Sequence, residues 1–95
     1  MALKKDRRLD EARQEIQEID EKISSLFVQR MKAAEQVAAF KKDYGLAIHV
    51  PEREEENIKR QSEQLEDPNL VGFYAEYMRE TMRVSRSYQE QIISG

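Results

Sequence analysis

The sequence predicts an all-α fold, in which one protomer has three helices with a very long first helix and two protomers form an intertwined homodimer. Apolar residues recur at alternating steps of three and four from Leu9 to Tyr44, which is the spacing of a continuous helix. Two shorter stretches begin with or near a proline and keep the same spacing. We therefore expect a single helical domain over residues 1–95, with helices at about 7–44, 51–65 and 68–92.

The first helix is expected to be longer than the protein is wide. No proline or glycine occurs among the 36 residues from Leu9 to Tyr44, which would span about 54 Å at about 1.5 Å per residue. A compact chain of this length has a radius of gyration of about 12 Å, hence a diameter of about 32 Å. A second copy of the chain would cover the apolar side of the overhanging helix. That side is formed by Leu9, Ala12, Ile16, Ile19, Ile23, Leu26, Ala33, Val37, Phe40 and Tyr44.

Local signals mark the ends of the three predicted helices. Gly45 suits the left-handed conformation that often follows the last turn of a helix. Pro51 suits the first position of the second helix, and the glutamates after it favour the positive end of the helix dipole. Asp67 is expected to cap the third helix, with Pro68 in its first turn.

Composition narrows the class of protein. Of the 95 residues, 39% are hydrophobic and 37% are charged. This apolar content is low for a stable monomer of this size. The net charge of -3 offers no basic excess for nucleic-acid phosphates, and zero cysteines exclude a disulfide framework and a thiolate metal site. No apolar run approaches the length of a membrane span, and Lys4, Lys5, Arg7 and Arg8 precede no signal-peptide segment. We expect a cytoplasmic protein that binds neither nucleic acid nor membrane.

Arg30 interrupts the apolar side of the first helix. It lies between Leu26 and Ala33, where burying a guanidinium costs several kcal/mol unless an anion pairs with it. Lys41 follows eleven residues later, so the two cations share one face to within about 20°, with a rise of about 16 Å. Both side chains could converge on one small anion. Arg13 lies about 25 Å from Arg30 along the helix and about 100° around it, so it would reach the same ligand only from the partner chain.

Polar residues also occupy the third helix, where its spacing predicts a buried side. Ser85 and Gln89 lie one turn apart on that side. Together with residues of the first two helices they form an ordered set along the chain. The set comprises Arg13, Ile16, Ile19, Asp20, Leu26, Arg30, Ala34, Val37 and Lys41, then Pro51, Glu52, Arg53 and Glu54, then Ser85 and Gln89.

With this set, the chain resembles the all-helical, type II chorismate mutase family from about Leu9 to Gln91. The resemblance implies an intertwined dimer with two active sites, each built chiefly from one chain. Arg13 of the partner subunit and Arg30 would hold the two carboxylates of chorismate. Lys41 and Gln89 would bind the ether oxygen of the bond that breaks.

The resemblance also implies residues that surround the substrate ring. Glu54 would accept a hydrogen bond from the ring hydroxyl, and Arg53 and Ser85 would complete the pocket. Where the family often has an aspartate before Pro51, this chain has Val50. Recognition of the hydroxyl would then depend more on Glu54, and the second helix would lose a cap worth about 1 kcal/mol.

The implied reaction explains the residue types. Conversion of chorismate to prephenate, in phenylalanine and tyrosine biosynthesis, is an intramolecular rearrangement, for which we expect no cofactor and no metal. An enzyme helps by holding the compact diaxial conformer and by stabilising negative charge on the ether oxygen. Lys41, Gln89 and Arg30 are therefore the expected catalytic residues, because a cation and an amide donor suit that oxygen and arginine suits a carboxylate.

Each of these residues also has a purely structural explanation. A single arginine on a helix is usually solvated, Ser85 can bond to its own helix, and Gln89 can fix the register of packed helices. We assign no role to His49. The alternative functions are isochorismate-pyruvate lyase on the same scaffold and a non-enzymatic helical dimerisation module. The sequence leaves open whether the chain is separate or is fused to, or associated with, another aromatic-biosynthesis enzyme.

Overall fold

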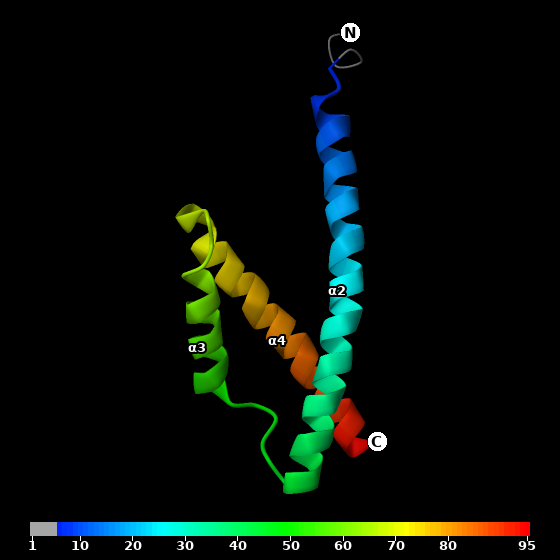
Figure 1. Ribbon diagram of the computed structural model, residues 1–95, viewed down its shortest axis with the longest axis vertical. Helices are drawn as coiled ribbons and strands as arrows, with labels where there is room; N and C mark the ends of the chain where they lie inside the picture. The colour runs from blue at the N-terminus through cyan, green and yellow to red at the C-terminus, as the bar shows by residue number, and fades with distance from the viewer. Residues whose placement is uncertain (1–5) are drawn as a thin grey trace. The chain divides into compact units, whose positions relative to one another are not determined.

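Three α-helices make up most of the computed structural model, which describes residues 6–95. Helix α2 spans Arg8–Tyr44, α3 spans Pro51–Ser62 and α4 spans Val71–Ser94, with the short 3-10 helix η1 at Pro68–Leu70 directly before α4 (Figure 1). No strand occurs among residues 6–95. The all-α class and the long first helix are confirmed.

The chain divides into two compact units, Met1–Lys32 and Ala33–Gly95, and α2 contributes to both. Lys4 and Lys5, which entered the expectation on a signal peptide, lie outside the described residues. The first unit contains the N-terminal part of α2, whose large apolar side chains are exposed in the single chain. Those on the predicted apolar side are Leu9, Ile16, Ile19, Ile23 and Leu26. A helix gains most of its stability in water from packing such a side, and in the single chain this side is not packed.

The end of α2 follows its sequence signal. Gly45 adopts a φ of 63°, in the left-handed region, as predicted. The N–H of Leu46 donates to the carbonyl of Lys41 at 2.8 Å, and the N–H of Gly45 donates to the carbonyl of Lys42 at 3.4 Å. This pair of bonds is a Schellman motif, which satisfies carbonyl groups that the helix itself leaves unpaired.

We predict opposite effects for alanine at two glycines. Gly45→Ala should lower the free energy of unfolding by about 1–2 kcal/mol, because a side chain disfavours the left-handed conformation. Gly72→Ala is the matched control, since Gly72 lies in α4 and an added Cβ would meet no atom within 4 Å. It should raise stability by about 0.5 kcal/mol. Urea denaturation of both variants checks this, and equal effects at the two positions would contradict it.

Helix α3 begins without a side-chain cap and ends earlier than expected. Val50 occupies the cap position, and its carbonyl accepts from the N–H groups of Arg53 and Glu54 at 3.1 and 3.2 Å, but its side chain makes no capping bond. The expected end near residue 65 is wrong, because α3 stops at Ser62. Beyond it, the N–H of Leu65 bonds to the carbonyl three residues earlier, at 3.2 Å, so the chain tightens into 3-10-type turns.

Asp67 caps the next helical segment, as predicted. Its side chain accepts a hydrogen bond from the N–H of Asn69 at 3.0 Å. The segment that it caps is η1, with Pro68 in its first position, and the regular α-helix follows from Val71. The third helix therefore starts with a 3-10 turn and extends to Ser94, two residues beyond the expected end.

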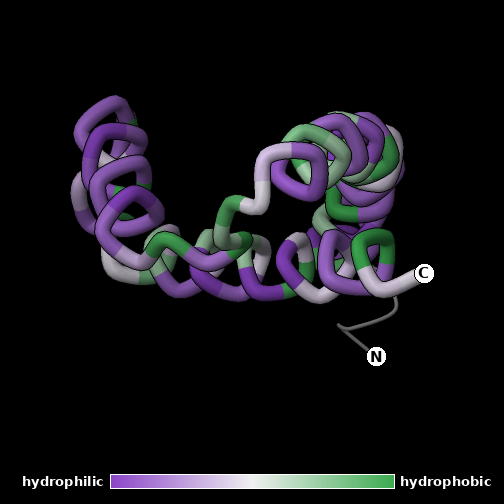
Figure 2. Tube along the Cα trace, turned by 90° about the horizontal axis from the view of Figure 1, so that it is seen from below, coloured by the Kyte–Doolittle hydropathy of each residue, from purple (hydrophilic) through white to green (hydrophobic). Residues whose placement is uncertain are grey.

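Helices α3 and α4 pack against each other within the second unit. Ile58 of α3 and Met78 and Met82 of α4 form the buried core between them, and Tyr74 packs against it with its hydroxyl donating to Gln61 at 3.2 Å. Most of α3 is hydrophilic, as the colours of Figure 2 show, so Ile58 supplies the main apolar contact of this helix. The predicted helical spacing in α3 and α4 accounts for this core.

The C-terminal part of α2 buries small residues. Ala34 and Ala38 are 5% and 0% exposed. Next to Ala34, Glu35 of α2 accepts a hydrogen bond from the hydroxyl of Tyr88 on α4. This hydrogen bond to the carboxylate raises the pKa of Tyr88, because it stabilises the neutral phenol. The two alanines are buried, while the larger Val37 between them in the sequence stays exposed.

Candidate functional site

The most deeply buried polar group among the predicted site residues is on α4. Ser85 is 6% exposed and Gln89 is 8% exposed, which confirms that both lie on the buried side of the helix. The Nε2 of Gln89 donates to the Oγ of Ser85 at 3.2 Å. Within the described residues, the Oε1 of Gln89 is buried and has no hydrogen-bond partner.

An unpartnered buried acceptor is unusual in a folded protein. Leaving such an atom unsatisfied costs about 1–3 kcal/mol. A half-turn of the Gln89 amide would exchange its two ends, so that the hydroxyl of Ser85 donates to Oε1 and Nε2 becomes free. In that orientation the pair presents a buried amide donor to a ligand and keeps its hydrogen bond to the neighbouring hydroxyl.

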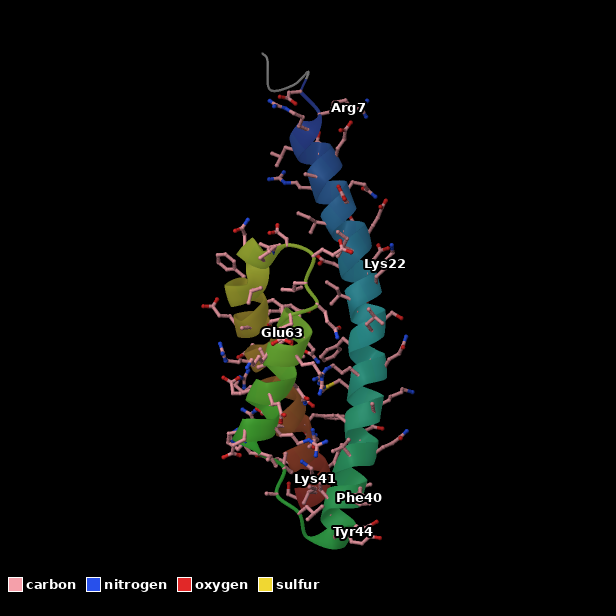
Figure 3. The ribbon with its side chains drawn as sticks, turned by 60° about the vertical axis from the view of Figure 1, so that its left-hand side comes forward. Arg7, Lys22, Phe40, Lys41, Tyr44 and Glu63 are labelled. Carbon is pink, nitrogen blue, oxygen red and sulfur yellow. The ribbon has the colours of Figure 1, made fainter. Side chains whose placement is uncertain are left out.

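Lys41 lies near the end of α2 and contacts the connection to α3. Its side chain is half-buried, and its Nζ donates to the carbonyl of Ile48 at 3.0 Å. Figure 3 shows Lys41 on the side of the helix that this connection approaches. An ammonium group has three donors, so the bond to Ile48 leaves two for a ligand.

Glu54 is held in a small charged cluster between α3 and α4. The guanidinium Nη1 of Arg86 forms an ion pair with Oε1 of Glu54, and these side chains are 21% and 23% exposed. The Nε2 of His49 lies 3.8 Å from the same oxygen. The structure therefore places two basic groups around the carboxylate that the family resemblance assigns to the substrate hydroxyl.

The remaining predicted site residues are exposed arginines. Arg53 lies in the first turn of α3 and makes no ion pair within residues 33–95. Arg13 and Arg30 belong to the first unit, and within residues 6–32 neither pairs with an acidic side chain. These three guanidinium groups are available to an anionic ligand.

Comparison with known proteins identifies the family. The family described as chorismate mutase type II matches residues 12–90, which is most of the chain. The chain belongs to the type II chorismate mutase family. All seven predicted site residues lie inside the matched segment.

A curated relative supports the same assignment. The bifunctional chorismate mutase/prephenate dehydratase of Aquifex aeolicus (strain VF5) is 48% identical to this chain over 52 residues. That match covers 55% of this chain and 14% of the relative, so the chain spans only a small part of the bifunctional protein. None of the solved structures gives a significant match.

Arg86, which pairs with the predicted site residue Glu54, was not among the residues that the sequence singled out. The spacing of two arginines in the sequence could have indicated this pairing. Arg79 and Arg86 are seven residues apart, hence on one face of α4, and each pairs with one of the adjacent glutamates Glu55 and Glu54. In the sequence, the helix dipole alone accounts for the glutamates after Pro51, so Arg86 has no obvious partner.

Two other types of site do not occur in the part of the chain that the structure describes. Within residues 6–95, no three His, Cys, Asp or Glu side chains gather closely enough to hold a metal ion. In the same range, no helix combines the length and the apolar character that a membrane crossing needs.

Proposed function

We propose that this protein catalyses the rearrangement of chorismate to prephenate, acting in the cytoplasm in aromatic amino acid biosynthesis. The observation that carries the proposal is the buried pair Ser85 and Gln89, inside the segment matched by the family, with an amide oxygen that has no partner among residues 6–95. This reaction breaks a C–O bond and forms a C–C bond within one molecule. A fixed amide donor and a cation stabilise the negative charge that grows on the ether oxygen.

Gln89 and Lys41 supply those two groups in the proposed mechanism. The amide of Gln89, turned so that Oε1 accepts from Ser85, donates Nε2 to the ether oxygen. Lys41 donates from the opposite side of the oxygen with an N–H that Ile48 does not use. Hydrogen bonds to Ser85 and Ile48 hold the two side chains before the reaction, so that little reorganisation accompanies the charge development.

The carboxylates of the substrate are assigned to arginines of two chains. Arg30 binds one carboxylate and Arg13 of the partner subunit binds the other, with the bidentate geometry that suits guanidinium groups. The exposed apolar side of α2, which includes Ile16 and Ile23, supports this dimer, because a second chain would cover it. Glu54 accepts from the ring hydroxyl, and Arg53 completes the pocket.

Assaying the purified chain with two substrates tests this function. Chorismate and isochorismate are offered separately, and prephenate, salicylate and pyruvate are quantified by chromatography. Conversion of chorismate to prephenate well above the uncatalysed rate is the expected result. Salicylate and pyruvate from isochorismate would instead indicate an isochorismate-pyruvate lyase. If the chain neither binds nor converts either substrate, the result would favour a non-enzymatic helical dimerisation module.

Val50→Asp is predicted to raise both activity and stability. The new carboxylate can accept from the ring hydroxyl, and we expect kcat/KM to rise about fivefold. It can also cap α3, which lacks a side-chain cap, and add about 1 kcal/mol to the free energy of unfolding. Steady-state kinetics and urea denaturation measure the two effects.

Val50→Asn is the matched control for the charge. Asparagine caps helices about as well as aspartate. If both variants gain stability but neither gains activity, the position serves only the helix end. Loss of both properties in Val50→Asp would show that the half-buried Val50 side chain needs apolar surroundings.

A further inference from the structure

Two ion pairs join α3 to α4, and their environments differ. Arg79 pairs with Glu55 at 3.1 Å, and these side chains are 55% and 56% exposed. Arg86 pairs with Glu54, and these side chains are 21% and 23% exposed. An exposed pair contributes little because water competes for both charges, whereas a half-buried pair restricts both side chains more strongly. Arg86 therefore holds the carboxylate of Glu54 more firmly than Arg79 holds that of Glu55.

The contact with Arg86 leaves one oxygen of Glu54 unused. Arg86 donates to Oε1, and the Nε2 of His49 lies 3.8 Å from the same oxygen. Within residues 33–95 no hydrogen bond reaches Oε2. An ion pair requires an ionised carboxylate, and an ionised carboxylate only accepts hydrogen bonds. Oε2 is thus an acceptor of fixed orientation.

Val50 makes this acceptor more important. Its side chain has no polar atom, so the residue before α3 cannot bind a hydroxyl. We propose that Arg86 is a positioning residue, which orients Glu54 so that Oε2 accepts the ring hydroxyl of the substrate and thereby determines specificity for a hydroxylated ring. This inference rests on the proposed function, because it deepens the assignment of Glu54 at the same site.

The test compares two arginine variants with two substrates. Arg86→Gln removes the half-buried pair, and Arg79→Gln is the matched control, because it removes the exposed pair between the same two helices with the same change of charge. The substrates are chorismate and a chorismate analogue that lacks the ring hydroxyl. Circular dichroism and urea denaturation verify that each variant is folded.

Arg86→Gln is expected to lower kcat/KM for chorismate about tenfold and to leave kcat/KM for the analogue unchanged. Arg79→Gln should leave both values unchanged. Arg86→Lys keeps a positive charge and should recover part of the loss with chorismate. An equal loss with both substrates, or no loss with chorismate, overturns the inference, because Arg86 would then act on the fold, on another part of the substrate or not at all.

A double-mutant cycle keeps the inference testable if Arg86→Gln is poorly folded. In a Glu54→Gln background, replacing Arg86 by lysine should change kcat/KM for chorismate less than it does in the wild type, because there is no carboxylate left to orient. Additive effects overturn the inference. A wild-type chain that converts no chorismate would overturn the proposed function itself, and an active wild type with the wrong Arg86 results overturns the positioning role alone.

Discussion

Gln89→Glu is expected to be active in acid and to lose about tenfold in kcat/KM for each pH unit above the pKa of the new carboxyl group. The two side chains are close in shape, but only glutamate titrates. When protonated, it can donate a hydrogen bond to the ether oxygen as the amide does. When ionised, it places a negative charge against the oxygen on which negative charge develops. The wild type should show a nearly flat profile, because an amide donates at every accessible pH.

Two opposing effects determine where the activity of the variant falls. The side chain at position 89 is 8% exposed, and burial raises the pKa of a carboxyl group. A cation at the same ether oxygen, which we assign to Lys41, lowers it. The midpoint of the profile should therefore lie below the value that burial alone would give. In the variant, Ser85 can still donate to one carboxyl oxygen.

The experiment measures kcat/KM across pH for the wild type and for Gln89→Glu. Gln91→Glu is the matched control, because it adds the same charge at an exposed position two residues further along α4. Circular dichroism at each pH shows that the proteins stay folded. A flat profile for Gln89→Glu would mean that this residue does not donate to the breaking bond, and its burial would then be explained by helix packing.

Elements defined by local chemistry were predictable from the sequence. Gly45 ends α2 in the left-handed conformation, and Asp67 caps the segment before α4, because each depends on one residue and its immediate neighbours. The burial of Ser85 and Gln89 followed from helical spacing alone. These features need no knowledge of how the helices pack.

Features that depend on contacts between helices were not predictable in the same way. Helix α3 was expected to continue to Leu65, because Leu65 fits the spacing, yet the chain leaves the helix after Ser62. No proline, glycine or capping residue marks that end. The hydroxyl of Ser62 is buried without a partner within the described residues, and the sequence contains no signal for this.

The candidate site shows the same division. Sequence spacing and the family resemblance selected Glu54, but they did not reveal that Arg86 pairs with it across 32 residues. Likewise, the bond from Lys41 to Ile48 depends on the path of the connection between α2 and α3. Periodicity identifies the face on which a residue lies, whereas the partner of a charged side chain depends on the packing of two elements.

Arg13→Ala and Arg30→Ala are each expected to lose activity by about a hundredfold or more, and a mixture of the two should regain part of it. Each arginine is assigned to a substrate carboxylate, and removing one partner of such a charge pair costs about 2–5 kcal/mol. If Arg13 acts in the partner's site, a mixed dimer places both defects in one site and leaves the other intact. Random pairing makes about half of the dimers mixed, so an equal mixture should reach about a quarter of wild-type activity.

The two proteins are unfolded in urea, mixed, refolded together and assayed with chorismate, and native mass spectrometry counts the mixed dimers. The matched control mixes Arg30→Ala with Gln89→Ala. Because the proposed site takes both of these residues from the same chain, every mixed dimer then carries one defect in each site, and activity should not return. Recovery in the control, or no recovery with Arg13→Ala despite verified mixed dimers, would contradict the assignment of Arg13 to the partner's site. Recovery with Arg13→Ala and Arg30→Ala, but not in the control mixture, is expected only if two chains pair through the exposed side of α2 and each contributes its Arg13 to the site of the other.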